Sequence, residues 1–201
     1  MKEDVFMKEE FEWIQTWCDR TANKDLPRVL LVGDSITRAY YEYVKDKLEG
    51  KCYVDYIAMS YAVDSKVYTG AAAGLAADSD YALIHFNHGL HGWHMTDRVY
   101  GEGIEKLLKE IGKNRKVILA TSTIVKETGN ARIDYKQTGI ILRRNEVVKF
   151  IAGKYGYGVN DLYTVSANLP NEMRTDDGVH YTEAGSERLA EHVAKAILAA
   201  L

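Results

Sequence analysis

Short apolar runs alternate along this chain with longer stretches of helical spacing, and this alternation restricts the fold more than any other feature. The first run, Val29 to Val32, is continuously apolar, which is typical of a strand buried on both faces of a parallel sheet. Further strand-like runs lie at 53–58, 81–86, 116–122 and 159–163, with helical stretches at 64–77, 97–113, 135–155 and 183–201. Strands that alternate with helices pair in parallel through right-handed crossovers. We therefore predict an α/β fold: a three-layer α/β/α sandwich whose central five-stranded parallel sheet has a flavodoxin-like strand order.

The composition is that of one folded domain over residues 1–201. With 201 residues, 46% hydrophobic and 27% charged, the chain has enough apolar side chains for one sizeable core. A net charge of -3 supplies neither a basic field for nucleic acid nor a polybasic patch for a membrane, so we expect neither partner. The sequence leaves the oligomeric state open. The acidic start is unlike a signal peptide and the two cysteines have no metal or redox spacing, so we expect a cytoplasmic protein.

The first residues are predicted to form a helix. Met7, Phe11, Ile14 and Cys18 recur at helical spacing. This pattern predicts an amphipathic helix over residues 4–20, within an N-terminal helical extension (1–25) that packs on the rest of the domain.

Three stretches are rich in polar residues. GDSIT at 33–37 and FNHGLHGWH at 86–94 lie at the ends of predicted strands, and TDDGVHYTEAG at 175–185 leads into the last predicted helix. They would meet at the carboxyl edge of a parallel sheet, where ligands bind in such folds. A serine needs a base, an orienting carboxylate and oxyanion donors to act as a nucleophile. Ser35 in the strand-to-helix turn is the candidate nucleophile. His180 and Asp177, three residues apart, are the candidate base and orienting carboxylate. Asp176 competes for the carboxylate role, and the spacing favours Asp177.

The stretches VGDSIT and DGVHYTEAG resemble the first and last sequence blocks of the SGNH hydrolases, also called GDSL-type esterases. The resemblance covers residues 28–201. It implies that Ser35 is the nucleophile, His180 the general base and acid, and Asp177 the group that orients the histidine. It also implies an oxyanion hole made by the Ser35 backbone N–H and the side chain of Asn87, and a reaction without cofactor or metal.

Two family blocks depart from the usual pattern. The third block normally reads Gly-x-Asn-Asp, whereas this chain has Asn87-His88-Gly89-Leu90. The glycine expected after the second strand is missing, so the backbone N–H groups of residues 60–62 are donors by position only. The predicted substrate-binding residues are Tyr61, His91 and Trp93 in these loops and Asp34 in the first block. Asp34 also suits a structural role in the turn.

Other interpretations exist for the same residues. A serine at a helix start is commonly a cap, so Ser35 has a purely structural alternative. His85, His88, His91 and His94 recur every third residue, which invites a metal site. One of them lies in a predicted strand and the others in a loop, so this spacing does not bring them together, and we predict no metal site.

We therefore expect a serine esterase that hydrolyses short-chain acyl esters, acetyl esters of carbohydrates included, through an acyl-enzyme. One alternative is a non-catalytic protein that binds a carbohydrate or an acyl ligand on the same fold. A thioesterase or lysophospholipase would use the same triad. A phosphate-binding flavodoxin-like module would explain the Ser35 turn but leave DGVH unexplained.

Overall fold

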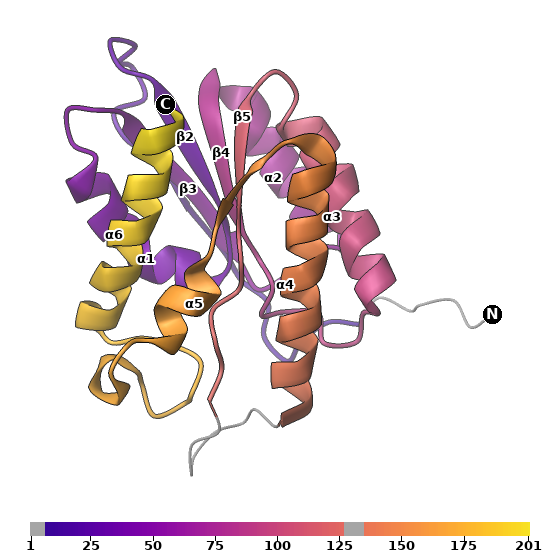
Figure 1. The fold of residues 1–201 in the computed structure, drawn as a ribbon. Helices are drawn as coiled ribbons and strands as arrows, with labels where there is room; N and C mark the ends of the chain where they lie inside the picture. Colours follow the sequence, from indigo (N-terminus) through magenta and orange to yellow (C-terminus); the bar gives the residue numbers. More distant parts are fainter. Residues whose placement is uncertain (1–6, 127–134) are drawn as a thin grey trace.

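The computed structural model describes residues 7–126 and 135–201. A six-stranded sheet in the order β1-β3-β2-β4-β5-β6 forms its centre (Figure 1). The five strands from β2 onward are parallel and follow the predicted order, with the second strand outside the first. The bounds are β1 Ile14–Trp17, β2 Arg28–Gly33, β3 Tyr53–Met59, β4 Tyr81–Asn87, β5 Lys116–Ala120 and β6 Gly158–Asn160.

Helices cover both faces of the sheet and complete the predicted three layers (Figure 1). One face carries α1 (Ser35–Lys47), α5 (Leu162–Ala167) and α6 (Glu183–Ala200). The other carries α2 (Lys66–Asp78), α3 (Asp97–Ile111) and α4 (Tyr135–Tyr155). A short 3-10 helix, η1 (Asn171–Met173), precedes the last helix. Among the described residues, no helix combines the length and apolar character needed to cross a bilayer.

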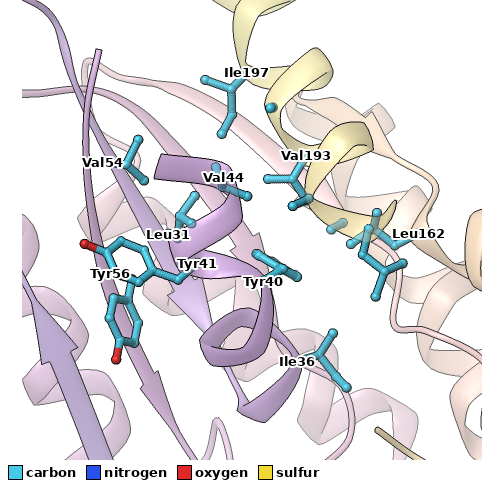
Figure 2. Packing of buried hydrophobic residues seen from close by; sticks show 14 of the residues in the cluster. Leu31, Ile36, Tyr40, Tyr41, Val44, Val54, Tyr56, Leu162, Val193 and Ile197 are labelled. Carbon is cyan, nitrogen blue, oxygen red and sulfur yellow. The ribbon is translucent and has the colours of Figure 1, made fainter. Parts of the chain in front are cut away.

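Each face of the sheet has its own apolar cluster, which explains why β2 is apolar without interruption. Val29 and Leu31 pack under α1 and α6, while Leu30 and Val32 pack under the opposite helices. Figure 2 shows the first cluster, where α1 and α6 meet over the sheet through side chains such as Val44 and Val193. Burying both faces fixes the register of β2, because a shift by one residue would exchange its two sets of side chains. The end of β2 and the start of α1 are thereby held in place.

The predicted N-terminal helix is wrong over the described residues. Ile14–Trp17 forms the edge strand β1, which pairs antiparallel with β3. All four residues are exposed, so the helical spacing of apolar side chains does not reflect a buried face. Residues 4–6 of the predicted helix lie outside the described residues.

The last predicted strand is also placed differently. The structure has the three-residue strand β6 at Gly158–Asn160, and the chain then turns into α5 at Leu162. Asp161 caps this helix by accepting a hydrogen bond from the Thr164 N–H at 3.2 Å. An aspartate directly before a helical run is a helix-start signal, and here it stands inside the apolar run at 159–163 that suggested a strand.

Candidate functional site

Ser35 is the first residue of α1, directly after β2, at the carboxyl edge of the sheet. Its neighbour Asp34 is the N-cap, with Oδ1 accepting a hydrogen bond from the Ile36 N–H at 3.0 Å. The other oxygen of Asp34 accepts from the Gly89 N–H at 3.4 Å, which ties the turn to the loop after β4. Because Asp34 performs the capping, the hydroxyl of Ser35 remains available for another partner. The structural alternative for Ser35, a capping serine, is therefore not what the structure shows.

That partner is His180, whose Nε2 lies 2.8 Å from Ser35 Oγ. On the other side of the ring, Nδ1 lies 2.6 Å from Oδ2 of Asp177. The histidine sits just before α6, whose N-cap is Thr182. Gly178, between Asp177 and His180, has φ of 73°, a backbone conformation that favours glycine and lets the turn bring the two side chains together. The structure thus joins the three predicted catalytic residues in one hydrogen-bonded series.

Asp177 is held as a carboxylate. Its Oδ1 accepts from the Thr175 hydroxyl at 2.7 Å and from the N–H groups of Val179 at 2.8 Å and His180 at 2.9 Å. Partial burial opposes the charge, but the hydrogen bonds from His180, Thr175 and Val179 outweigh it and hold the pKa of Asp177 well below its usual range. The side chains of His180 and Asp177 are 40% and 49% exposed, so the pair is open to solvent while Ser35 is nearly buried.

Asn87, the predicted oxyanion donor, ends β4 and is paired in register with Gly33. Its side-chain amide donates to the Tyr40 hydroxyl at 3.3 Å, and that hydroxyl lies 3.0 Å from Thr37 Oγ1. All three side chains are buried. Asn87 is therefore held from α1, and its second amide hydrogen is the one that would serve a ligand. Sequence reasoning did not identify Tyr40 and Thr37 as its supports.

The Ser35 backbone N–H, the other predicted oxyanion donor, belongs to the first residue of α1. The first N–H groups of a helix have no partner within the helix, and they lie at its positive end. Ser60, considered by position as another donor, is not free for this purpose. Its N–H donates to the Trp13 carbonyl at 3.1 Å and its hydroxyl accepts from the Trp13 N–H at 2.9 Å.

The four predicted substrate-binding residues have different surroundings. Asp34 holds the nucleophile turn, as described above. Tyr61 is partly buried against the cluster under α2 and α3. Trp93 is partly buried, and the Arg144 guanidinium carbon lies 5.4 Å from its ring centroid. His91 Nδ1 lies 3.0 Å from both carboxylate oxygens of Glu9, so the N-terminal segment reaches the loop after β4.

The pKa of His91 is shifted by these neighbours. Burial opposes protonation, but the hydrogen bond to Glu9 and the nearby charge of Asp34 outweigh it and raise the pKa of His91. His88 is fully enclosed beside it, and burial holds its pKa well below the usual value. Their rings stack with centroids 5.8 Å apart.

The four regularly spaced histidines do not gather around one point. His85 pairs with Asn160 at 3.2 Å inside the sheet, and His94 pairs with Asp64 at 2.9 Å. His91 pairs with Glu9. Within the described part of the chain, no group of three or more histidine, cysteine or acidic side chains is arranged to hold a metal ion.

Arg144 supports the loop after β4 in a way that the sequence analysis missed. It is fully buried, and its guanidinium donates to the carbonyls of Gly89 at 2.9 Å, His91 at 2.7 Å and Gly92 at 2.6 Å. Its neighbour Arg143 is exposed and pairs with Asp97 at 2.7 Å. Two adjacent arginines in a helix are usually solvated, so only its place on the apolar face of α4 distinguishes Arg144.

Comparison with known proteins yields structures rather than sequences. No protein-family model matches the chain, and no curated protein sequence matches it significantly. A GDSL-like lipase from Bacteroides thetaiotaomicron superposes with a TM-score of 0.71 at 18% identity, over 87% of this chain and 89% of that one. An acetylxylan esterase, Axe2, from Geobacillus stearothermophilus gives a TM-score of 0.70 at 18% identity, over 85% and 94%. The catalytic domain of peptidoglycan O-acetyltransferase A from Streptococcus pneumoniae gives 0.67 at 17% identity, over 87% and 94%.

These likenesses cover nearly the whole of each neighbour, so the chain has the fold of the SGNH hydrolases. At this level of identity the fold alone is established. The chemistry of this chain has to be argued from its own side chains.

Proposed function

We propose that this protein is a serine ester hydrolase that cleaves short-chain acyl esters through an acyl-enzyme. The observation that carries the proposal is the series from Ser35 Oγ to His180 Nε2 at 2.8 Å and from His180 Nδ1 to Asp177 at 2.6 Å. Both distances are within the range needed for proton transfer and for orienting the base. Neighbours of this fold described as a GDSL-like lipase and an acetylxylan esterase support the reaction class.

In the first half of the reaction, Ser35 Oγ attacks the ester carbonyl carbon while His180 Nε2 takes the hydroxyl proton. The carbonyl oxygen becomes an oxyanion, to which the Ser35 N–H and the Asn87 amide would donate hydrogen bonds. His180 then returns the proton to the departing alcohol oxygen as the C–O bond breaks. Asp177 remains ionised and stabilises the imidazolium.

In the second half, water replaces the alcohol. His180 takes a proton from the water as its oxygen attacks the acyl carbon, and then gives a proton back to Ser35 Oγ as the acid leaves. An acetyl ester of a carbohydrate fits this scheme, and the acetylxylan esterase of the same fold favours it. The loops after β3 and β4, which carry Tyr61, His91 and Trp93, would then contact the sugar.

The experiment measures hydrolysis of p-nitrophenyl acetate and its longer-chain homologues by the wild-type chain and by Ser35→Ala and His180→Ala. Active-site labelling with a fluorophosphonate accompanies it. We expect turnover that declines with acyl length and that is lost in both variants, together with labelling that depends on Ser35. The non-catalytic binding protein would replace this proposal if a folded wild-type chain neither turns over these esters nor reacts with the label.

A further inference from the structure

A cation–π pair lies beside the nucleophile turn. The guanidinium carbon of Arg38 is 4.5 Å from the centroid of a Trp13 ring. Arg38 is the third residue after Ser35 in α1, so the two side chains leave the same side of the helix, with Cβ atoms about 5–6 Å apart. Helical side chains lean toward the helix N-terminus. We therefore expect the side chain of Arg38 to extend toward the turn that carries Ser35.

The indole is fixed from a different part of the chain. Trp13 immediately precedes β1, and its backbone N–H and carbonyl both bond to Ser60, at 2.9 and 3.1 Å. Ser60 in turn directly follows β3, the strand beside β2. The backbone of Trp13 is thus anchored at the carboxyl edge of the sheet, and its partly buried indole attracts the guanidinium of Arg38.

Arg38 is exposed, and among residues 7–126 and 135–201 no carboxylate oxygen lies within 4.0 Å of its guanidinium. Other exposed arginines of the chain do have such partners: Arg20 with Glu49, Arg98 with Glu102, Arg143 with Asp97 and Arg188 with Glu191. A guanidinium that lies over an aromatic ring can stack on it through its flat face, and its N–H groups then remain available along its edge in the plane. That edge is the one that binds carboxylate or phosphate in a two-pronged manner.

We propose that Arg38 and Trp13 form an anion subsite for the alcohol portion of the substrate, so that the preferred esters carry a carboxylate or a phosphate on that portion. This inference rests on the ester hydrolase function proposed above. The acyl carbonyl has to reach the nearly buried Ser35, whereas Arg38 lies on the exposed rim of the same helix face. The part of the substrate at the rim is then the departing alcohol.

The test compares matched acetyl esters: 4-acetoxybenzoate, its neutral methyl ester and 4-acetoxyphenyl phosphate. Each kcat/KM is divided by the rate of spontaneous hydrolysis. We expect the wild type to prefer the charged esters, and Arg38→Gln to lower the charged-to-neutral ratio about tenfold, as loss of one charge-assisted hydrogen bond implies. Lys45→Gln removes the same charge from α1, so it is the control and should keep the ratio within about twofold. Each charged ester gives a ratio of its corrected kcat/KM to that of the neutral ester. The charged ester with the larger ratio shows whether a carboxylate or a phosphate is preferred.

Trp13→Leu provides a second arm, with Trp17→Leu, an exposed residue of β1, as its control. Loss of the stack should lower the charged-to-neutral ratio, whereas the Trp17 variant should keep it. A wild type that does not prefer charged esters, or equal loss in Arg38→Gln and Lys45→Gln, would overturn the subsite while Ser35-dependent hydrolysis of the neutral ester still stands. If no ester is hydrolysed in a Ser35-dependent way, the proposed function fails and the subsite with it.

Discussion

One amide substitution tests the orienting role proposed for Asp177. It accepts a hydrogen bond from the Thr175 hydroxyl and two from backbone N–H groups as well as bonding His180, so the turn retains most of its contacts when the charge is removed. We expect Asp177→Asn to fold normally and to lower kcat by about 10³- to 10⁴-fold, because the amide favours the wrong histidine tautomer and no longer stabilises the imidazolium.

The neighbouring Asp176→Asn is the matched control, and steady-state kinetics with p-nitrophenyl acetate make the comparison. Asp176 carries the same charge one residue away, so a general loss of negative charge would affect both variants alike. Equal losses in the two variants would contradict the assignment of Asp177 as the orienting carboxylate.

Gly33 leaves no room for a side chain. A Cβ built there would lie 2.0 Å from Thr37 Oγ1 and 2.4 Å from the Asn87 carbonyl oxygen, which belongs to the paired strand. We expect Gly33→Ala to lower the free energy of unfolding by about 1 to 3 kcal/mol, because backbone has to move to accept the methyl group. Gly70→Ala is the control: nothing lies within 4 Å of its Cβ position in α2, so it should stabilise the protein by about 0.5 to 1 kcal/mol. Urea unfolding of the two variants measures the difference.

At the scale of the elements, α4 fixes the loop after β4 through one side chain. Arg144 binds three carbonyls of residues 89–92 and stacks over Tyr100 at 4.7 Å. Burial of the guanidinium lowers the pKa of Arg144, yet its surroundings are carbonyls that only a donor can satisfy. We expect Arg144→Met to cost at least about 3 kcal/mol of unfolding free energy, because it leaves these carbonyls buried without partners.

The adjacent Arg143→Met supplies the comparison, since its side chain is exposed and makes a surface ion pair. It should change the free energy of unfolding by less than about 1 kcal/mol. Similar denaturant midpoints for the two variants would show that the loop does not depend on Arg144.

The helices and strands that could be predicted from the sequence are those in which burial determines the spacing of apolar side chains. The parallel strands from β2 to β5 lie between two apolar clusters, and each of the helices α1, α2, α3, α4 and α6 packs one face against the sheet, so the side-chain periodicity of these elements indicates their structure. The edge strand β1 escapes this reasoning because its side chains are exposed and it is held by backbone pairing with β3 and by Ser60. Apolar spacing in such a segment carries no information about which face is buried.

The residues of the candidate site also differ in how far the sequence predicts them. Ser35, Asp177 and His180 lie in short turns with recognisable local sequence, and the predicted parallel sheet brings those turns to one edge. The supports of the loops, Tyr40 for Asn87 and Arg144 for residues 89–92, come from distant elements. Contacts of that kind depend on the packed fold and leave no local pattern.

At the scale of the whole molecule, the helices packed on both faces of the sheet enclose a titratable group, His85 of β4. The imidazole is fully buried, and the Asn160 amide donates to its Nε2 at 3.2 Å, so Nε2 carries no proton. Burial lowers the pKa of His85 to about 4. In the unfolded chain a histidine has a pKa of about 6.5. Between these values the unfolded chain binds a proton that the folded protein excludes.

The sign of the effect follows from that difference. Stability rises with pH wherever the unfolded state binds more protons, so the contribution of neutral His85 is complete above about pH 6.5 and is lost progressively toward pH 4. One such proton gives a slope of about 1.4 kcal/mol per pH unit, and His88, whose pKa is also lowered by burial, adds to it. His91 acts in the opposite sense, since its raised pKa stabilises the folded protein at acid pH and that contribution disappears as pH rises through the folded value.

His85→Gln separates these contributions, because glutamine does not titrate and its amide oxygen can still accept from Asn160. Urea unfolding at intervals from pH 7 to pH 4.5 should show a shallower decline in this variant, by about one proton, or roughly 1.4 kcal/mol per pH unit, in the lower part of the range. The variant will be somewhat less stable at pH 7, so the quantity to compare is the slope of the unfolding free energy against pH and not its absolute value. A slope equal to that of the wild type would mean that the buried pair of His85 and Asn160 is not what makes the sheet sensitive to acid.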